Sequence, residues 1–411
     1  MKITQLFKIY WPDNGGGIAK VMEGIASGLT ECEHEIIVCQ GSRHKKSMDD
    51  TYQGIAVRRC RQIFAPVSTP VSLRFLYDVK THTKDTDIVI SHFPYPMADL
   101  AVLFGLYSGH LVVWWHCGFE KYERLAPFYR PLVQHTLNKA DRILVSSREN
   151  IKNSALLRRY RNKCSVIPFC VDHEYLERGN AYARACEEQE KKTAGKITPE
   201  KLPAGNRQVQ ILFIGRLVWY KGCDVLLRAF GKMRLTDCRL VLVGSGPLEQ
   251  QLKDLASDLK LKNVTFTGMI SEEEKMQQIE ACDFLVLPSV SKAEAFAVVQ
   301  LEAMAFGKPV INTALPSGVP YVSIDGVTGK TVKPGSIREL TAAMEELAQN
   351  EPLRREYGAN ARRIVQEEYT QELMVDRHRR VFKKLCEGKT EKVCRNVRKR
   401  ADSSKSGVWK R

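Results

Sequence analysis

The sequence predicts an α/β protein built from two doubly wound domains. Strand-like and helix-like runs alternate along most of the chain, which is typical of a parallel sheet covered by helices. The alternation stops between about residues 173 and 207 and then starts again. A chain of 411 residues is long enough for two or three domains with cores of their own. We therefore expect a first domain over 1–172, a linker or surface insertion over 173–207, and a second domain over 208–366.

The first domain begins with a predicted strand over Ile3–Ile9, a glycine-bearing loop, and a helix whose apolar residues recur at helical spacing. Its further strands are predicted at Glu35–Cys39, Asp87–Ser91, Leu111–Trp115, Arg142–Val145 and Ser165–Ile167. The segment after them is charged and contains Pro and Gly, which is typical of a linker.

The second domain has the same rhythm. Its strands are predicted at Val209–Ile214, Arg239–Val243, Val264–Phe266 and Phe284–Leu287. Helical runs follow from Glu339, and we expect the last helix, over 367–387, to cross back to the first domain. Residues 388–411 form a basic tail, which is either a solvated chain end or a contact with a membrane surface.

Charge and cysteine usage limit the class of protein. A formal net charge of +16 favours a polyanionic partner, such as a phosphorylated ligand, an anionic membrane or nucleic acid. The tail lacks any recognised nucleic-acid module, so we expect no nucleic-acid partner. The twelve cysteines are scattered and form no CxxC pair, which favours reduced thiols in the cytoplasm over a disulfide framework or a zinc site. We find no signal peptide, and no apolar run reaches the roughly 18 residues of a transmembrane helix.

The stretch from Pro288 to Val310 reads as strand end, loop, helix and strand, with the helix over about residues 297–306. In a parallel sheet such a loop lies at the carboxyl end of a strand, where ligands bind. Glu294 in the loop and Glu302 in the helix bracket the turn, while the helix start offers free amides to an anion. These amides belong to Phe296, Ala297 and Val298. An anion site between two hydrogen-bond acceptors would suit a nucleotide sugar.

Two further loops carry groups that suit phosphate. Arg216 and Lys221 follow the first strand of the second domain, and a planar guanidinium and a compact ammonium both bind phosphate oxygens. Gly16 and Gly17 follow the first strand of the first domain, where missing side chains let backbone amides approach a ligand. The glycines do not form a GxGxxG pattern, so no dinucleotide fingerprint is predicted. When such a run is seen alone, an ordinary strand-to-helix turn is the more common explanation.

The sequence also contains one DxD tripeptide, Asp85-Thr86-Asp87, which is a metal-binding signature in another transferase fold. It directly precedes an apolar strand, so we interpret it as a strand-entry turn. Arg216 and Lys221 can supply the positive charge that a metal would bring, so we expect no metal site.

Several of these segments resemble glycosyltransferase family 4, the retaining transferases of GT-B fold. The resemblance lies in GRLVWYKG, in VGSGP at residues 243–247, and in EAFAVVQLEAMAFGKPVI at 294–311. The opening FKIYWPDNGGGIAKV and SGVPYVS at 317–323 are similar to bacterial transferases that build O-antigen, capsule or exopolysaccharide chains. The resemblance covers nearly the whole chain apart from the insertion and the tail, and it implies two Rossmann-like domains facing a central cleft.

The resemblance also implies roles for these residues. Glu294 would bind hydroxyls of the donor sugar, and Glu302 would hold the ribose of the nucleotide. Arg216 and Lys221 would stabilise the leaving diphosphate. His116 matches a histidine that the family places near the transferred sugar, and Gly16 and Gly17 would contact the donor from the opposite domain. The chain departs from the family at Ala295 and Ala297, which flank Phe296 where the family commonly has glycines.

The expected function is therefore that of a cytoplasmic retaining hexosyltransferase in bacterial surface polysaccharide biosynthesis. It would use a UDP- or GDP-linked sugar, a lipid-linked glycan acceptor and no cofactor, and could contact an anionic membrane at the inner face of the cell membrane. Two alternatives remain: a nucleotide-sugar epimerase of the same fold, and a non-catalytic scaffold that binds glycan or nucleotide sugar. An epimerase would convert the donor without any acceptor, and a scaffold would show no turnover.

Overall fold

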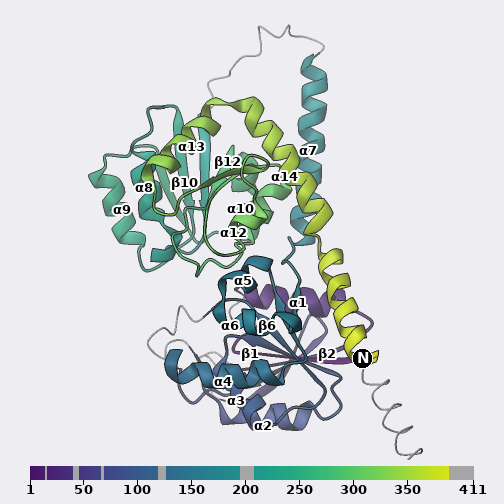
Figure 1. The fold of residues 1–411 in the computed structure, drawn as a ribbon. Helices are drawn as coiled ribbons and strands as arrows, with labels where there is room; N and C mark the ends of the chain where they lie inside the picture. The colour runs from purple at the N-terminus through teal and green to yellow at the C-terminus, as the bar shows by residue number, and fades with distance from the viewer. Residues whose placement is uncertain (14–15, 40–45, 66–68, 119–125, 195–207, 388–411) are drawn as a thin grey trace, which may run out of the picture. The chain divides into compact units, whose positions relative to one another are not determined.

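The chain forms two compact units, each organised around one sheet (Figure 1). The computed structural model describes residues 1–13, 16–39, 46–65, 69–118, 126–194 and 208–387. Unit 1 comprises Met1–Val145, Ser154–Ile167 and the chain from Met374 on, whereas unit 2 comprises Ser146–Asn153 and Pro168–Leu373. The predicted α/β fold class with two parallel-sheet domains is confirmed. The predicted basic tail lies outside the described residues.

Unit 1 contains an eight-stranded sheet in the order β3-β4-β2-β1-β5-β6-β7-β8. Its strands are β1 (Lys2–Phe7), β2 (Glu33–Cys39), β3 (Met48–Tyr52), β4 (Ile55–Cys60), β5 (Ile88–Phe93), β6 (His110–Trp115), β7 (Arg142–Val145) and β8 (Cys164–Val166). The helices are α1 (Gly17–Gly28), α2 (Leu73–His82), α3 (Pro96–Leu103), α4 (Ala126–Lys139) and α6 (Ala155–Arg159), followed by the 3-10 turn η3 (Arg161–Lys163). Figure 1 shows the sheet between α1 on one face and α2, α3 and α4 on the other. All strand pairs are parallel except β3 with β4, as crossover helices require.

The sequence analysis did not predict the β3–β4 hairpin, because its strands are rich in charged residues. Gln53 and Gly54 both have positive φ at the tip, as a tight hairpin turn of this hand requires. Arg59 on β4 is buried and pairs with Asp13 at 3.1 Å and with Asp50 at 3.0 Å. The two carboxylates compensate the buried guanidinium, so a charge that argues against a strand in the sequence is satisfied in the fold.

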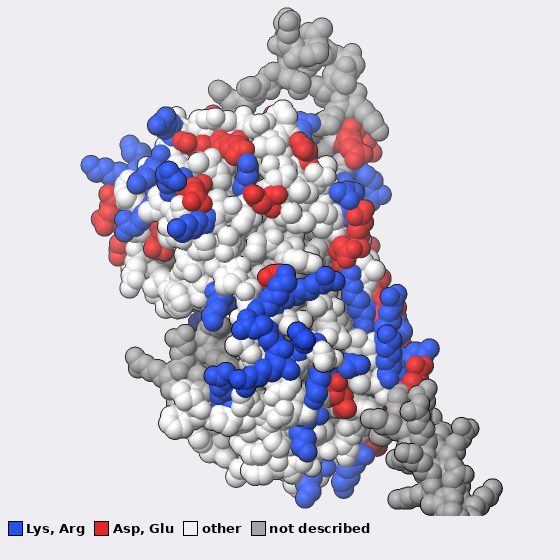
Figure 2. Space-filling model, viewed as in Figure 1, with Lys and Arg blue, Asp and Glu red and all other residues white. Residues whose placement is uncertain are grey.

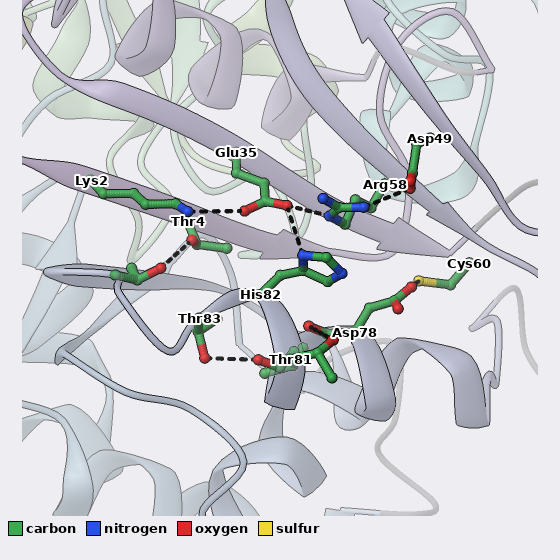
Figure 3. Close-up of polar contacts among 12 residues, drawn as sticks. Lys2, Thr4, Glu35, Asp49, Arg58, Cys60, Asp78, Thr81, His82 and Thr83 are labelled. Atoms are coloured by element: carbon green, nitrogen blue, oxygen red, sulfur yellow. Dashed lines mark hydrogen bonds and ion pairs between the residues drawn. The ribbon is translucent and has the colours of Figure 1, made fainter.

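A polar cluster lies toward the amino ends of the unit 1 strands (Figure 3). The buried Glu35 carboxylate pairs with Arg58 and lies 3.9 Å from Lys2. Lys2 also pairs with Asp85 at 3.1 Å, and its backbone amide donates to Asp87 at 2.9 Å. Both carboxylates of the DxD tripeptide therefore fix the start of β1, which agrees with a strand-entry turn. The carboxyl ends of the strands are left for the functional groups.

Unit 2 contains a six-stranded parallel sheet in the order β11-β10-β9-β12-β13-β14. Its strands are β9 (Val209–Ile214), β10 (Cys238–Val243), β11 (Val264–Gly268), β12 (Phe284–Val286), β13 (Val310–Thr313) and β14 (Gly329–Val332). Its helices are α5 (Arg148–Asn153), α7 (His173–Ala194), α8 (Cys223–Phe230), α9 (Glu249–Asp258), α10 (Glu272–Ala281), α11 (Val299–Ala305), α12 (Val319–Val322), α13 (Ile337–Gln349) and α14 (Glu351–Glu368). Helices α8, α9 and α13 pack together, and α11 packs against α7 and α14. The apolar core lies between the sheet and the first group.

Glycines let the loops at the carboxyl ends of β9, β10 and β12 approach one another closely. A Cβ at Gly244 would lie 2.2 Å from the carbonyl oxygen of Gly215, and one at Gly246 would lie 2.3 Å from that of Leu217. Gly222 has φ +67°, and a Cβ there would lie 2.2 Å from the carbonyl oxygen of Pro288. Any larger residue at these positions would force the backbones apart.

The predicted linker or surface insertion over 173–207 begins with the helix α7 over His173–Ala194, which the sequence analysis did not predict. Among the described side chains of this helix, one stripe packs beside α11: Tyr175 and Tyr182 contact Phe306, and Gly179 approaches the carbonyl of Ala305. The other residues are mostly polar, so the apolar period is too weak to reveal a helix. Residues 195–207 lie outside the described part.

The ends of the predicted domains also differ slightly from the units. Residues 168–172 belong to unit 2, where the Val171 amide donates to Tyr369 O at 2.9 Å and Phe169 packs on Phe296. Residues 371–387 are helical, and from Met374 on they belong to unit 1. There Val375 lies against Gly28 of α1. In the part of the chain that the structure describes, no helix has the length and apolar character needed to cross a bilayer.

Candidate functional site

Lys221 and Glu294 form an ion pair at the carboxyl ends of the unit 2 strands. The Lys221 Nζ lies 2.5 Å from Glu294 Oε2, and both side chains are almost fully buried. Lys221 ends the 3-10 turn η5 (Trp219–Lys221) after β9, and the tight contact of Gly222 with Pro288 holds this turn against the end of β12. The two predicted residues are therefore brought together although they lie far apart in the sequence.

The Glu294 carboxylate is held by a second group. Ser289 Oγ donates to the same Oε2 at 3.1 Å, and Thr313 Oγ1 donates to the Ser289 carbonyl at 2.6 Å. Lys221 and Ser289 thus fix one oxygen of the carboxylate. This arrangement orients the other oxygen, and Lys221 keeps positive charge beside it.

Arg216 lies after β9 in the same loop, but its side chain is exposed. Among the described residues its guanidinium has no ion-pair partner. The amides of its neighbours Gly215 and Leu217 donate to the carbonyls of Val243 and Ser245, each at 2.9 Å, which fixes this loop against the end of β10. An exposed guanidinium on a rigid loop is available to an anionic ligand.

Glu302 is also paired with a lysine. Its Oε2 lies 2.8 Å from Lys275 Nζ on α10, and the Lys275 ammonium lies 5.1 Å from the ring centroid of Tyr175. Tyr175 in turn donates to Glu272 at 2.7 Å, and burial is the main reason why the pKa of Tyr175 is raised. The sequence analysis missed Lys275, because a lysine in a charged helix carries no signal of the carboxylate it will meet.

The helix after the Glu294 loop begins later than predicted, at Val299 instead of Ala297. Ala297 has φ +60°, a left-handed conformation that disfavours any residue with a Cβ and so interrupts the helix. In the described structure the amides of the three predicted residues donate no backbone hydrogen bond to the protein; these residues are Phe296, Ala297 and Val298. Their donors are consequently available, as the sequence predicted.

A buried amide network fixes this loop to the next one. Gln300 Nε2 donates to the carbonyls of Phe296 at 3.1 Å and Val319 at 3.2 Å, and its Oε1 accepts from Asn312 Nδ2 at 2.9 Å. Asn312 also donates to Ser323 O at 3.1 Å. Because every partner is a fixed backbone or amide group, the loop before α11 is pre-organised. Sequence analysis did not identify these two amides.

In unit 1, His116 follows β6 and is 5% exposed. Its Nε2 lies 2.9 Å from His92 Nδ1, and its ring stacks on Trp114 with centroids 4.5 Å apart. Burial lowers the pKa of His116 to about 3, so the ring is neutral at pH 7. A neutral, buried imidazole suits hydrogen bonding rather than charge neutralisation.

Gly16 and Gly17 stand at the start of α1, also in unit 1. Gly16 is the N-cap residue, and its carbonyl accepts the Ala19 amide at 2.9 Å. Both glycines are exposed, and a Cβ at either would meet no atom of the described residues within 4 Å. The described part of the chain therefore leaves open space beside this backbone, which suits the close approach of a ligand.

Two parallel-sheet units with charged loops at the carboxyl ends of their strands are typical of GT-B glycosyltransferases. Solved structures support this class. Sucrose-phosphate synthase from Thermosynechococcus elongatus superposes with a TM-score of 0.71 at 19% identity, covering 93% of this chain and 98% of its own. HepE from Anabaena, solved in complex with UDP, has a TM-score of 0.70 at 18% identity and covers 93% of this chain and 100% of its own.

Sequence comparison identifies the family. The model for glycosyltransferase family 4 matches residues 15–175, and the model for glycosyl transferases group 1 matches residues 196–364. O-antigen chain mannosyltransferase C from Escherichia coli is 31% identical over 95% of this chain and 100% of its own length. D-rhamnosyltransferase WbpZ from Pseudomonas aeruginosa is 29% identical over 88% of this chain and 90% of its own. The chain therefore belongs to the glycosyltransferases with these two domains, and it is a GT-B glycosyltransferase. The predicted enzyme class is confirmed.

Proposed function

We propose that the chain transfers a hexose, with retention of anomeric configuration, from a nucleotide diphosphate sugar to a lipid-linked glycan during O-antigen synthesis. The observation that carries this proposal is the Lys221–Glu294 pair at 2.5 Å beside the free amides before α11. Two relatives, an O-antigen mannosyltransferase and a rhamnosyltransferase, support a hexose and an O-antigen product. The UDP complex of HepE supports a nucleotide diphosphate.

Each residue of the unit 2 site then has a chemical role. The bond between the sugar and the diphosphate breaks with its electrons moving to the diphosphate. The acceptor hydroxyl bonds to the anomeric carbon and gives its proton to an oxygen of the leaving diphosphate. Lys221 and exposed Arg216 stabilise the negative charge that develops on the leaving group. Glu294, oriented by Ser289, accepts hydrogen bonds from sugar hydroxyls, and Glu302 accepts from the ribose.

We further propose that the reaction needs no divalent metal, because Lys221 and Arg216 supply the positive charge. Activity should persist in excess chelator. A complete loss that magnesium or manganese restores would refute this part of the proposal.

The decisive test is transfer itself. The full chain is incubated with GDP-mannose or UDP-glucose and a lipid-linked glycan acceptor, and both nucleotide diphosphate release and the anomeric configuration of the product are measured. Acceptor-dependent release with a retained configuration is expected from one donor. Conversion of the donor without acceptor would instead identify an epimerase, and binding without turnover would identify a scaffold.

The lipid-linked acceptor implies a membrane contact, and unit 1 carries a basic surface that suits it. Arg158, Arg159 and Arg161 are exposed on α6 and η3, whereas Leu156 and Leu157 bury the other side of that short helix. Figure 2 shows Lys and Arg side chains gathered over this region. Clustered arginines attract the headgroups of anionic lipids, each contributing about 1 kcal/mol.

This contact is testable by co-sedimentation with vesicles containing phosphatidylglycerol. Replacing the three arginines with alanine should reduce binding, and added salt should reduce binding of the unchanged protein. A matched control removes three exposed charges from unit 2 by changing Lys232, Arg234 and Lys262 to alanine. Equal loss in both triple variants would show that net charge alone matters, and the α6 surface would then be excluded as the contact.

A further inference from the structure

Three polar side chains form a continuous buried chain across neighbouring strands of unit 1. Gln5 lies on β1, His92 on β5 and His116 directly after β6. Gln5 Oε1 lies 2.9 Å from His92 Nε2, and His92 Nδ1 lies 2.9 Å from His116 Nε2. Gln5 and His92 are fully buried, so neither side chain can form a hydrogen bond with bulk water. This series of hydrogen-bonded side chains ends at His116, the histidine that the sequence analysis assigned to the donor site.

The positions of the hydrogens in this series follow from the hydrogen bond that Gln5 makes with Met22. Gln5 Nε2 lies 2.9 Å from the Met22 carbonyl, which can only accept, so the amide nitrogen donates there. Gln5 Oε1 therefore faces His92, and His92 Nε2 must carry the hydrogen that it donates. A neutral imidazole carries a single N–H, so His92 Nδ1 accepts, and His116 Nε2 must donate to it.

Burial keeps both rings neutral. The pKa of His92 lies well below its ordinary value because of burial and of the neighbouring His116 and His378, and burial alone lowers that of His116. Two cationic rings at hydrogen-bond distance would also repel each other in a medium of low polarity. With Nε2 protonated, a neutral His116 carries its lone pair on Nδ1.

We propose that Gln5 and His92 are positioning residues that hold His116 in the Nε2–H tautomer, so that Nδ1 serves as a hydrogen-bond acceptor for a hydroxyl of the transferred sugar. The sugar contact rests on the proposed function, whereas the tautomer does not. The direction matters chemically, because the anomeric centre becomes electron-poor as the diphosphate leaves. A lone pair directed at the sugar stabilises that charge, and an N–H in its place opposes it.

The first test reads the tautomer directly and needs no activity. The full chain is labelled with 15N-histidine, and the His116 ring signals are assigned by their loss in His116→Gln. In the unchanged protein we expect a protonated Nε2 and an unprotonated Nδ1. In His92→Leu we expect a mixture of both tautomers. A protonated Nδ1 in the unchanged protein would overturn the inference whatever the enzyme transfers.

The second test uses turnover. His92→Leu removes the acceptor of His116 and should lower kcat about tenfold to a hundredfold, the range found for partners that orient histidine ligands. The KM for the donor should change less. His92→Asn places an amide oxygen near the former Nδ1 and should restore most of the rate. If leucine and asparagine variants that are both folded lose the same rate, the orientation of His116 is not what His92 supplies.

His378→Leu is the matched control, since it removes another fully buried histidine of unit 1, whose Nε2 accepts from Trp114 at 3.2 Å. It should reduce stability without changing the tautomer of His116. A mixed His116 tautomer in this variant too would show that general loosening of unit 1, and not the Gln5–His92 chain, controls the ring. If no donor supports transfer, the spectroscopic test still decides the inference, so the two failures are distinguishable.

Discussion

The polar clusters of the two units differ in charge: the cluster of unit 2 consists of ion pairs, and the cluster of unit 1 consists of neutral groups. In unit 2 each candidate glutamate has its own lysine, Lys221 for Glu294 and Lys275 for Glu302. In unit 1 the cluster contains neutral rings and an amide, joined by hydrogen bonds of fixed direction. Charged pairs can respond to the charge of a diphosphate, whereas a neutral chain sets the direction of one hydrogen bond without adding charge. Unit 2 thus supplies charged groups, and unit 1 supplies a hydrogen bond of fixed direction.

The largest expected effect comes from removing charge in unit 2. Lys221→Ala and Arg216→Ala should each lower turnover roughly tenfold to a thousandfold, with a smaller loss of donor affinity, because the cations meet charge that develops in the transition state. The double variant should cost less than the sum of the two free energies, since both groups act on one diphosphate. Acceptor-dependent release of nucleotide diphosphate measures this.

A matched control is Lys253→Ala, which breaks an exposed pair with Glu249 at 2.7 Å on α9 of the same unit. Its turnover should stay near that of the unchanged enzyme, because exposed pairs contribute little. Circular dichroism checks that each variant is folded. Unchanged turnover in both folded site variants would exclude these loops as the reaction site.

The second effect concerns binding rather than turnover. Glu302→Ala should weaken donor affinity about tenfold or more, because the ribose hydroxyls lose a charged acceptor. Glu272→Ala is the control, since Glu272 shares Lys275 with Glu302 but is the more distant partner at 3.4 Å. Titration calorimetry with the donor compares them. An unchanged affinity in Glu302→Ala means that Glu302 does not hold the ribose.

The third prediction tests whether the buried histidines of unit 1 are neutral. The pKa of His116 is about 3 and that of His378 about 4 in the folded chain, both below the ordinary value of 6.5 because of burial. Unfolded histidines therefore bind more protons in this range, so stability is fully present above pH 6.5 and falls as the pH drops toward 4. Each neutral histidine contributes about 1.4 kcal/mol per pH unit in this range.

Denaturant unfolding at several pH values measures this slope, and His378→Leu should reduce it. Asp99 opposes the trend, because burial raises the pKa of its carboxyl to about 6 and thereby favours the folded state at low pH. A stability that does not change between pH 6.5 and pH 5 would contradict the neutral cluster.

The smallest effect is at Ala297, whose φ of +60° is strained for alanine. Ala297→Gly should raise the free energy of unfolding by about 1 kcal/mol, whereas Ala295→Gly, at a position without positive φ, should lower it by about 0.5 kcal/mol. Thermal unfolding compares the two. Equal changes in both variants would show that the left-handed backbone of the loop costs the chain nothing.

Periodicity predicted most of the strands, and loop chemistry selected residues that the structure places at the ends of strands. The strand Val209–Ile214 was predicted to the residue, and Lys221 and Glu294 were chosen because each follows a strand. The partners Lys275 and His92 were not found, because they gain their roles only when distant elements meet. The hairpin that includes Arg59 was missed for a related reason: its compensating carboxylates are invisible in a local window.

The tight glycine contacts of unit 2 have a consequence for engineering. At Gly222, Gly244 and Gly246 the loops touch through backbone atoms, with a Cβ excluded at 2.2 to 2.3 Å. The framework around the site therefore depends on main-chain contacts that most side-chain changes leave alone. Libraries that vary the exposed side chains of these loops should therefore keep the fold of unit 2, provided that the three glycines are left unmutated.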